Sequence, residues 1–305
     1  VFARESSFLF NNLLLVVAGV TVFWGTVFPL INEAVMGTKM NVGPEFYNEV
    51  NGPIIYALAG LAGVCVALEW RRTGRSNLIS KFKYPLAAGV SSVPMLYLLG
   101  FTDGVSLLGF ALIAFAIATH LQEYVLDLAA HKRKGFGIVP SLYGTILASR
   151  RRYGGYIVHL SMFLILIGII GSQLYASSYP LTLKQDEPAQ IGEYTFVFEG
   201  QIVESSSDKI VRALKLSVRD GAGSTRVLSP SLTDTRESQL TTVQVAVLSL
   251  PLKDIYIIPQ GVEDRVASLR VSFFPLIGFI WSGGVIMILG VTVCLLPKRR
   301  SSVES

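Results

Sequence analysis

The stretch YGGYIVHLSMFLILIGIIG, residues 153–171, is an apolar segment long enough to cross a lipid bilayer. About 20 helical residues at a rise of ~1.5 Å each span a ~30 Å hydrocarbon core. Arg150, Arg151 and Arg152 precede the segment, and one ionisable residue, His159, lies inside it. An ionisable side chain within a spanning helix is costly, so the segment predicts both a membrane protein and a functional residue.

His159 has two interpretations. Neutral imidazole is a common ligand of metal ions and of haem iron. Gly155 lies four residues earlier on the same helix face, where a flat cofactor can approach the backbone closely. The alternative is a histidine that only hydrogen-bonds to a neighbouring helix. The residues by themselves leave both interpretations open.

The composition of the whole chain is typical of a membrane protein. Of the 305 residues, 51% are hydrophobic and only 15% are charged, and the mean hydropathy is +0.53. The net charge of +5 does not indicate nucleic-acid binding, because the basic residues cluster beside apolar segments. Cys65 and Cys294 form no CxxC or CxxCH motif. This argues against thiol redox chemistry and against covalent haem attachment to this chain.

Hydropathy predicts a polytopic α-helical membrane protein with six transmembrane helices and an external all-β domain between the last two. We expect a membrane domain over residues 1–176, an external β-rich domain over residues 177–270, and a final span with a basic tail over residues 271–305. The five spans of the first domain are expected at about residues 8–30, 53–70, 84–100, 105–128 and 153–175.

The distribution of basic residues predicts the orientation. Six spans put both termini on one side of the membrane. Lysine and arginine are concentrated in residues 71–83, in residues 131–152 and after Leu296, whereas residues 31–51 carry only Lys39. The positive-inside rule therefore places both termini in the cytoplasm. Residues 177–270 then lie on the opposite side, outside the cytoplasm, since long loops are exempt from the rule.

The external segment has the alternating pattern of β-strands. EYTFVFEGQIV and DKIVRALKLSVRD alternate apolar and polar residues, and a DGAGS turn leads into TRVLSPSLTD. TTVQVAVLS and KDIYIIPQ are two more candidate strands. Five or more short strands suffice for a small sandwich or barrel. The segment has no metal-ligand cluster, nucleophile–base pair or phosphate loop, which favours a docking or covering module.

The other two histidines have simpler interpretations. His120 lies late in the fourth span with Glu123 and Asp127, which favours an interfacial polar cluster over a cofactor site. His131 is expected in a solvated loop beside lipid headgroups. A bis-histidine haem at His159 therefore needs its second ligand from His120 or from another chain. Arg151 and Arg152 are expected to anchor the helix, and beside a haem they also match its propionates.

Several stretches, taken together, resemble the C-terminal part of the CcmF family of cytochrome c maturation proteins, which includes NrfE-like lyases. The resemblance follows the order of the chain. The matching pieces are RESSFLFNNLLL (4–15), MNVGPEFYN (40–48), RRYGGYIVHL (151–160), IGIIGS (167–172), SQLTTVQVAV (238–247), KDIYI (253–257) and IGFIWSGGVIMILG (277–290).

The resemblance implies a part in a haem lyase that attaches haem covalently to apocytochrome c at the inner membrane. Family members receive haem from the chaperone CcmE, work with a CcmH-type protein that handles apocytochrome c, and carry a b-haem thought to take electrons from quinol. By this resemblance His159 matches one axial ligand of that haem b. The other ligand, the tryptophan-rich WWD segment and two external histidines belong to a part of the family that this chain does not match.

The resemblance also implies an incomplete enzyme. The three tryptophans, Trp24, Trp70 and Trp281, are scattered, so no WWD segment is present. We therefore expect one half of a split protein, or a fragment, that is inactive without its N-terminal half. Two other classes compete with this interpretation. A membrane-anchor cytochrome b normally brings its own histidine pair, and a transporter with a proton-relay histidine normally has several intramembrane charges.

Overall fold

The computed structural model describes residues 4–68, 75–132, 149–221, 223–235, 241–263 and 265–296. Three expectations therefore lie outside the described residues: the end of the second span at Trp70, most of the basic connection after His131, and the basic tail after Leu296. The chain divides into two units. The first comprises residues 1–166 and 282–305, and the second comprises residues 167–281.

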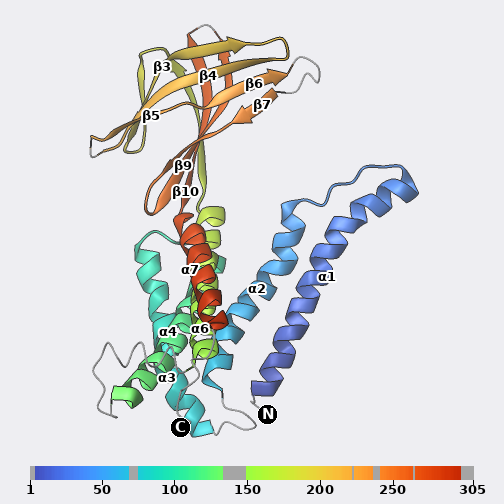
Figure 1. Cartoon of the computed structure of the whole chain (residues 1–305), viewed down its shortest axis with the longest axis vertical. Coiled ribbons are helices and arrows are strands. Elements are labelled where there is room, and N and C mark those ends of the chain that lie inside the picture. The colour runs from blue at the N-terminus through green and yellow to red at the C-terminus, as the bar shows by residue number, and fades with distance from the viewer. Residues whose placement is uncertain are drawn as a thin grey trace, which may run out of the picture. The chain divides into compact units, whose positions relative to one another are not determined.

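Long helices make up most of the described chain outside the β-strands (Figure 1). They are α1 (Arg4–Met36), α2 (Pro44–Ala67), α3 (Arg75–Leu98), α4 (Gly104–Lys132), α6 (Arg150–Leu174) and α7 (Gly278–Leu295). Within the described residues, five of them, all except α3, are long and apolar enough to cross a membrane. The multi-pass membrane fold is thus as predicted, but the sixth span is not confirmed. Lys81, Lys83, Ser91 and Ser92 lower the hydropathy of α3, which also contains Pro85 and Pro94.

Among the element boundaries that differ from the sequence predictions, three change the assignment of a segment. Residues 44–48 begin helix α2 instead of forming a loop, because Pro44 occupies the first helical position, where its missing N–H costs nothing. Helix α4 runs to Lys132, so His131 lies in its last turn and not in a loop. The last span begins later than expected, because residues up to Pro275 belong to a strand.

Helix α4 is the central helix of the first unit and packs against both α2 and α3. It starts at Asp103, whose carboxylate accepts the backbone N–H of Ser106 at 2.7 Å and so caps the helix. Small residues let the neighbours approach: a Cβ on Gly63 of α2 would lie 2.9 Å from the Ala116 backbone, and one on Gly89 of α3 would lie 2.9 Å from the Ala111 carbonyl oxygen. This packing fixes the position of α4.

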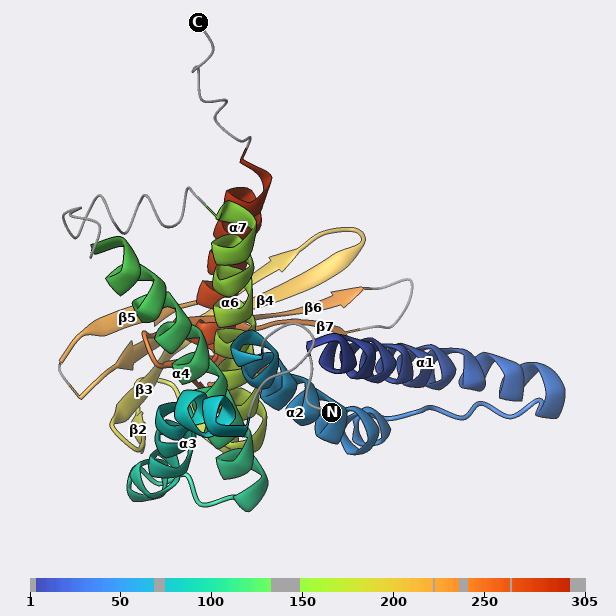
Figure 2. The same cartoon turned by 90° about the horizontal axis from the view of Figure 1, so that it is seen from below.

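Helices α6 and α7 lie side by side (Figure 2), and small residues line their contact. In the first unit, a Cβ on Gly154 would lie 2.9 Å from the Gly290 carbonyl oxygen, and one on Gly283 would lie 2.8 Å from the Ser161 carbonyl oxygen. In the second unit, a Cβ on Gly168 would lie 2.9 Å from the Ile280 backbone nitrogen. Gly154, Ser161 and Gly168 follow a seven-residue repeat, which keeps one face of α6 on its partner.

The second unit contains two antiparallel sheets of ten described strands (Figure 1). One sheet has the order β1-β10-β9-β8, and the other has the order β2-β3-β4-β6-β7 with β5 paired to β4. The strands are β1 (Ser177–Lys184), β2 (Pro188–Ile191), β3 (Tyr194–Ser205), β4 (Lys209–Arg219), β5 (Thr225–Leu228), β6 (Ser231–Thr235), β7 (Thr241–Gln244), β8 (Ala246–Ser249), β9 (Lys253–Glu263) and β10 (Val266–Pro275).

The alternating patterns predicted from the sequence correspond to strands β3 to β9, and β1, β2 and β10 were not predicted. One core lies between the sheets and includes Phe196 and Leu216 from one sheet and Ile257 and Val271 from the other. The first strand pairs with the last, with Ser177 opposite Phe273. Because its ends meet in this way, the β-domain can be inserted between two helices without separating them.

Candidate functional site

Two histidines meet between helices α4 and α6. The Nε2 atom of His120 lies 3.0 Å from the Nδ1 atom of His159. The other ring nitrogen of His120, Nδ1, lies 2.8 Å from the carbonyl oxygen of Ala116, one turn earlier in α4. His120 is only 5% exposed. A chain of two hydrogen bonds therefore runs from the α4 backbone through His120 to His159.

Aromatic rings hold His120 in place. Tyr156 and Phe163, one turn before and one turn after His159 in α6, both meet the His120 ring edge-to-face, with centroids 5.3 and 5.4 Å away. The ring of His159 is itself nearly perpendicular to that of His120, at 84°. Edge-to-face contacts of this kind favour one ring orientation. The orientation of His120 is thus set by α6 as well as by its own helix.

The sequence analysis favoured a polar cluster of His120 with Glu123 and Asp127 and left His120 open as the partner of His159. The structure places the His120 imidazole directly against His159. One signal in the sequence was available: both histidines lie roughly two to three turns from the same basic connection. In two antiparallel helices joined by such a connection, residues at equal distances from it lie at similar depths.

A charged cluster lies next to the histidine pair. Arg152 of α6 approaches Asp127 at 2.9 Å and Glu123 at 3.4 Å, both on α4. The Tyr153 hydroxyl donates a hydrogen bond to Asp127, and the Arg152 Nε–H donates one to the Tyr156 hydroxyl at 2.9 Å. Arg152 therefore already has two carboxylate partners, a role that the sequence analysis did not foresee. A haem propionate would have to compete with these two carboxylates for Arg152.

We expect Arg152→Gln to lower the stability of the α4–α6 pair by about 1–2 kcal/mol. The substitution removes the Arg152 cation from Glu123 and Asp127, whose side chains are 15% and 29% exposed. Thermal denaturation in detergent measures the effect. The matched control replaces all three charges, as R152Q/E123Q/D127N, and should recover most of the loss. Equal destabilisation of both variants would show that the charges themselves do not matter.

Gly155 and Arg151 are the other predicted site residues, and both belong to α6. A Cβ on Gly155 would meet nothing within 4 Å, whereas one on the adjacent Gly154 would meet α7. The Arg151 side chain is exposed. The face of α6 that carries Gly155 and His159 continues to Met162, which is 47% exposed. At Gly155 this face is open, because no neighbouring atom lies within 4 Å of the position of a Cβ there.

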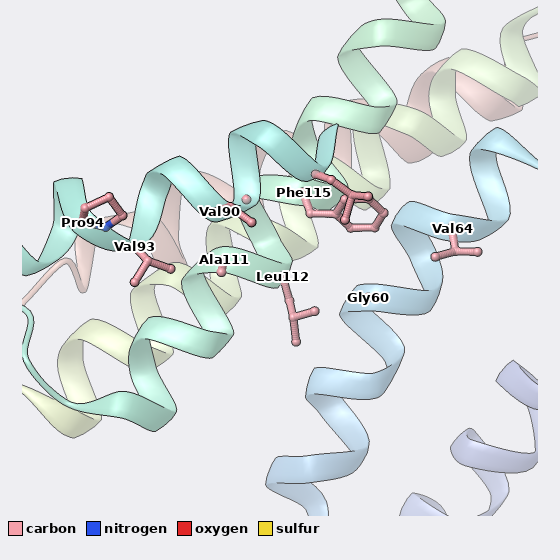
Figure 3. A pocket seen from close by; sticks show the side chains of 10 residues that line it. Gly60, Val64, Val90, Val93, Pro94, Ala111, Leu112 and Phe115 are labelled. Atoms are coloured by element: carbon pink, nitrogen blue, oxygen red, sulfur yellow. The ribbon is translucent and has the colours of Figure 1, made fainter. Parts of the chain in front are cut away.

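An apolar pocket of about 610 Å³ lies among α2, α3 and α4 (Figure 3). Leu112 and Phe115 point into it from α4, opposite Gly60 and Val64 of α2. Its other lining residues are Leu86, Gly89, Val90, Val93, Pro94 and Ala111. The lining has no ionisable side chain, so the pocket suits an apolar chain and provides no catalytic group. In the described part of the chain, no group of three or more His, Cys, Asp or Glu side chains is placed to hold a metal ion.

Comparison with known proteins gives a consistent result. No protein-family model matches the chain. The cytochrome c-type biogenesis protein CcmF of Haemophilus influenzae is 28% identical over 309 residues, covering 98% of this chain and 45% of that protein. CcmF of Pseudomonas aeruginosa is 27% identical, covering 97% of this chain and 44% of that protein. The chain is similar to CcmF proteins in their C-terminal part.

Two further comparisons extend the CcmF likeness. The cytochrome c-type biogenesis protein CycK of Bradyrhizobium diazoefficiens is 26% identical over 309 residues. A solved structure described as cytochrome c haem lyase CcmF aligns with a TM-score of 0.74 over 97% of this chain and 46% of that chain, at 22% identity. At that identity the CcmF structure shows a shared fold. The chain spans about half the length of the CcmF relatives that it matches.

Proposed function

We propose that the chain is the C-terminal half of a membrane haem lyase of cytochrome c biogenesis. The similarity to CcmF proteins over nearly the whole chain supports this role. Because the chain spans about half the length of those relatives, ligation of haem to apocytochrome c belongs to the complex of both halves. The isolated chain is proposed to be inactive.

The observation that carries the proposal is the pairing of His159 with an open helix face. His159 projects from α6 within one of the candidate membrane spans. Gly155, one turn away, presents no side chain, and a Cβ there would meet nothing within 4 Å. An imidazole nitrogen can bind haem iron, and a bare backbone beside it lets a flat tetrapyrrole approach the helix closely. The residues present therefore fit haem b.

In this proposal His159 would hold the haem iron. A haem b bound there supplies one-electron redox chemistry. Arg151, whose side chain is exposed, is proposed to pair with a haem propionate. Arg152 is proposed to add positive charge near the propionates while it keeps its ion pairs with Glu123 and Asp127.

The second axial ligand is proposed to come from the N-terminal half. Metal–imidazole bonds are ~2 Å long, so two ligand nitrogens on opposite sides of one iron lie ~4 Å apart. His120 and His159 are separated by 3.0 Å between nitrogens, which leaves no room for an iron between them. The spacing also argues against an independent cytochrome b built on this pair.

The remaining partners follow from the same role. We propose the N-terminal half with its WWD segment, the haem chaperone CcmE, a CcmH-type protein, apocytochrome c, and quinol as electron donor. The β-domain, residues 177–275, is proposed to lie on the periplasmic side of the inner membrane and to contact these proteins. The basic residues near the helix ends suit anionic lipid headgroups.

One observation favours a second candidate, a transporter with a proton relay. His120, His159, Tyr153, Asp127 and Glu123 are protonatable groups gathered at one α4–α6 contact. Such chains occur in proton pathways. This candidate predicts proton movement across vesicles without haem, whereas the haem-lyase role predicts haem binding.

A reduced-minus-oxidised optical spectrum tests the proposed function. The 305-residue chain is purified alone and together with a co-produced N-terminal half of a CcmF protein. We expect a b-type band only in the co-purified sample, because the chain provides one of two axial ligands. A b-type band of equal strength in the chain alone would contradict the split site. No haem in either sample would contradict the haem role.

A further inference from the structure

The hydrogen bonds around the histidine pair have a direction. The Ala116 carbonyl oxygen can only accept, so His120 must donate from Nδ1 across the 2.8 Å contact. A neutral imidazole carries one N–H, so Nε2 of His120 then bears a lone pair and accepts. Its partner across 3.0 Å, Nδ1 of His159, must therefore be the donor. His159 is left with its lone pair on Nε2.

The reverse direction requires a doubly protonated His120. Nε2 of His120 would then donate to His159, and the free nitrogen of His159 would carry a hydrogen instead of a lone pair. A cation at His120 is disfavoured because the side chain is 5% exposed and is enclosed by Tyr156 and Phe163. Neither of its two hydrogen-bond partners, a peptide carbonyl and a second imidazole, neutralises a positive charge.

We infer that His120 is a positioning residue that fixes the tautomer and the ring orientation of His159, so that Nε2 of His159 is the nitrogen presented to the haem iron. The inference rests on the proposed function for the identity of the ligand, but the tautomer of His159 is a property of the chain itself. Histidine ligands commonly donate their second N–H to a fixed acceptor, which orients the ring and raises its basicity. Here the acceptor is an imidazole anchored to the α4 backbone.

The effect on haem binding follows from this arrangement. Without an acceptor at position 120, the His159 ring is free to rotate and to exchange tautomers. The half-buried Nδ1–H group of His159 also loses its hydrogen-bond partner. Loss of such a supporting contact typically lowers metal affinity 10- to 100-fold. The ligand also becomes less basic, so the oxidised iron is stabilised less and the midpoint potential of the haem rises.

The variants His120→Leu and His120→Gln separate this role from simple packing. Leucine removes the acceptor. Glutamine fills similar space, and its amide can turn its oxygen toward His159. In the chain co-purified with its N-terminal half, we expect H120L to lose 10- to 100-fold in haem affinity and to raise the midpoint potential. We expect H120Q to keep most of the haem affinity and a midpoint potential close to that of the unsubstituted chain. Thermal denaturation of both variants controls for loss of fold.

A measurement without haem tests the tautomer directly. The chain contains only three histidines, so ¹⁵N-histidine labelling gives a spectrum that single substitutions can assign. We expect the neutral Nδ1–H form at His159, lost or mixed in His120→Leu. An Nε2–H form in the unsubstituted chain, or unchanged haem affinity and potential in folded His120→Leu, would overturn the inference. Full haem retention in His159→Ala would instead overturn the proposed function and leave the tautomer result standing.

Discussion

Replacing His159 with alanine removes the b-type haem spectrum of the complex formed with the N-terminal half, while the helices remain folded. The substitution removes the only proposed iron ligand of this chain, and haem held by one remaining imidazole loses much of its affinity. Alanine is also a strong helix former, so α6 itself is not weakened. The reduced-minus-oxidised spectrum and the haem content per protein measure the loss, which we expect to exceed 90% (about 1.4 kcal/mol for each tenfold change in affinity).

Two further variants give this experiment its controls. His159→Gly leaves a space in which added imidazole can bind the iron, and partial recovery of the spectrum is expected. His131→Ala, at the end of α4, should leave the haem content unchanged. If His159→Ala retains its full haem content, the ligand assignment is wrong.

Replacing Gly154 with alanine destabilises the α6–α7 pair by about 1–3 kcal/mol, the typical cost of inserting a methyl group into a full contact. The new Cβ would lie 2.9 Å from the Cys294 backbone nitrogen and 2.9 Å from the Gly290 carbonyl oxygen, and it would also meet the Cys294 sulfur. Backbone atoms cannot rotate away as a side chain can, so the helices must separate. Thermal denaturation of the purified chain in detergent measures the difference.

The adjacent glycine is a matched control. Gly155→Ala makes the same chemical change one position along the same helix, but its Cβ would meet nothing within 4 Å. We expect it to be neutral or to stabilise α6 by up to about 1 kcal/mol, because alanine favours helix over glycine. Equal losses from both variants would indicate that flexibility of the GlyGly pair, and not its contact with α7, determines stability.

Local sequence patterns determined the class of this protein and the positions of most elements. Runs of apolar residues predicted the spans at α1, α2, α4, α6 and α7, because the bilayer requires long stretches without charge. Alternation predicted strands β3 to β9, because successive strand residues face opposite sides of a sheet. Strands β1, β2 and β10 escaped prediction, and α3 does not qualify as a span among the described residues. Their residues give weaker local signals, and β1 pairs with β10, which comes from the other end of the domain.

The sequence also singled out His159, because an ionisable residue inside a span is unusual. It did not reveal that His120 is its partner, that Arg152 holds Glu123 and Asp127, or that Gly154 and Gly155 have opposite surroundings. Each of these depends on how far one helix is rotated and shifted against another. Hydropathy records how apolar a helix is, but not which face meets a neighbour 39 residues away in the chain. Only the tertiary packing of α4, α6 and α7 decided those contacts, because the fit of many side chains sets the rotation of each helix.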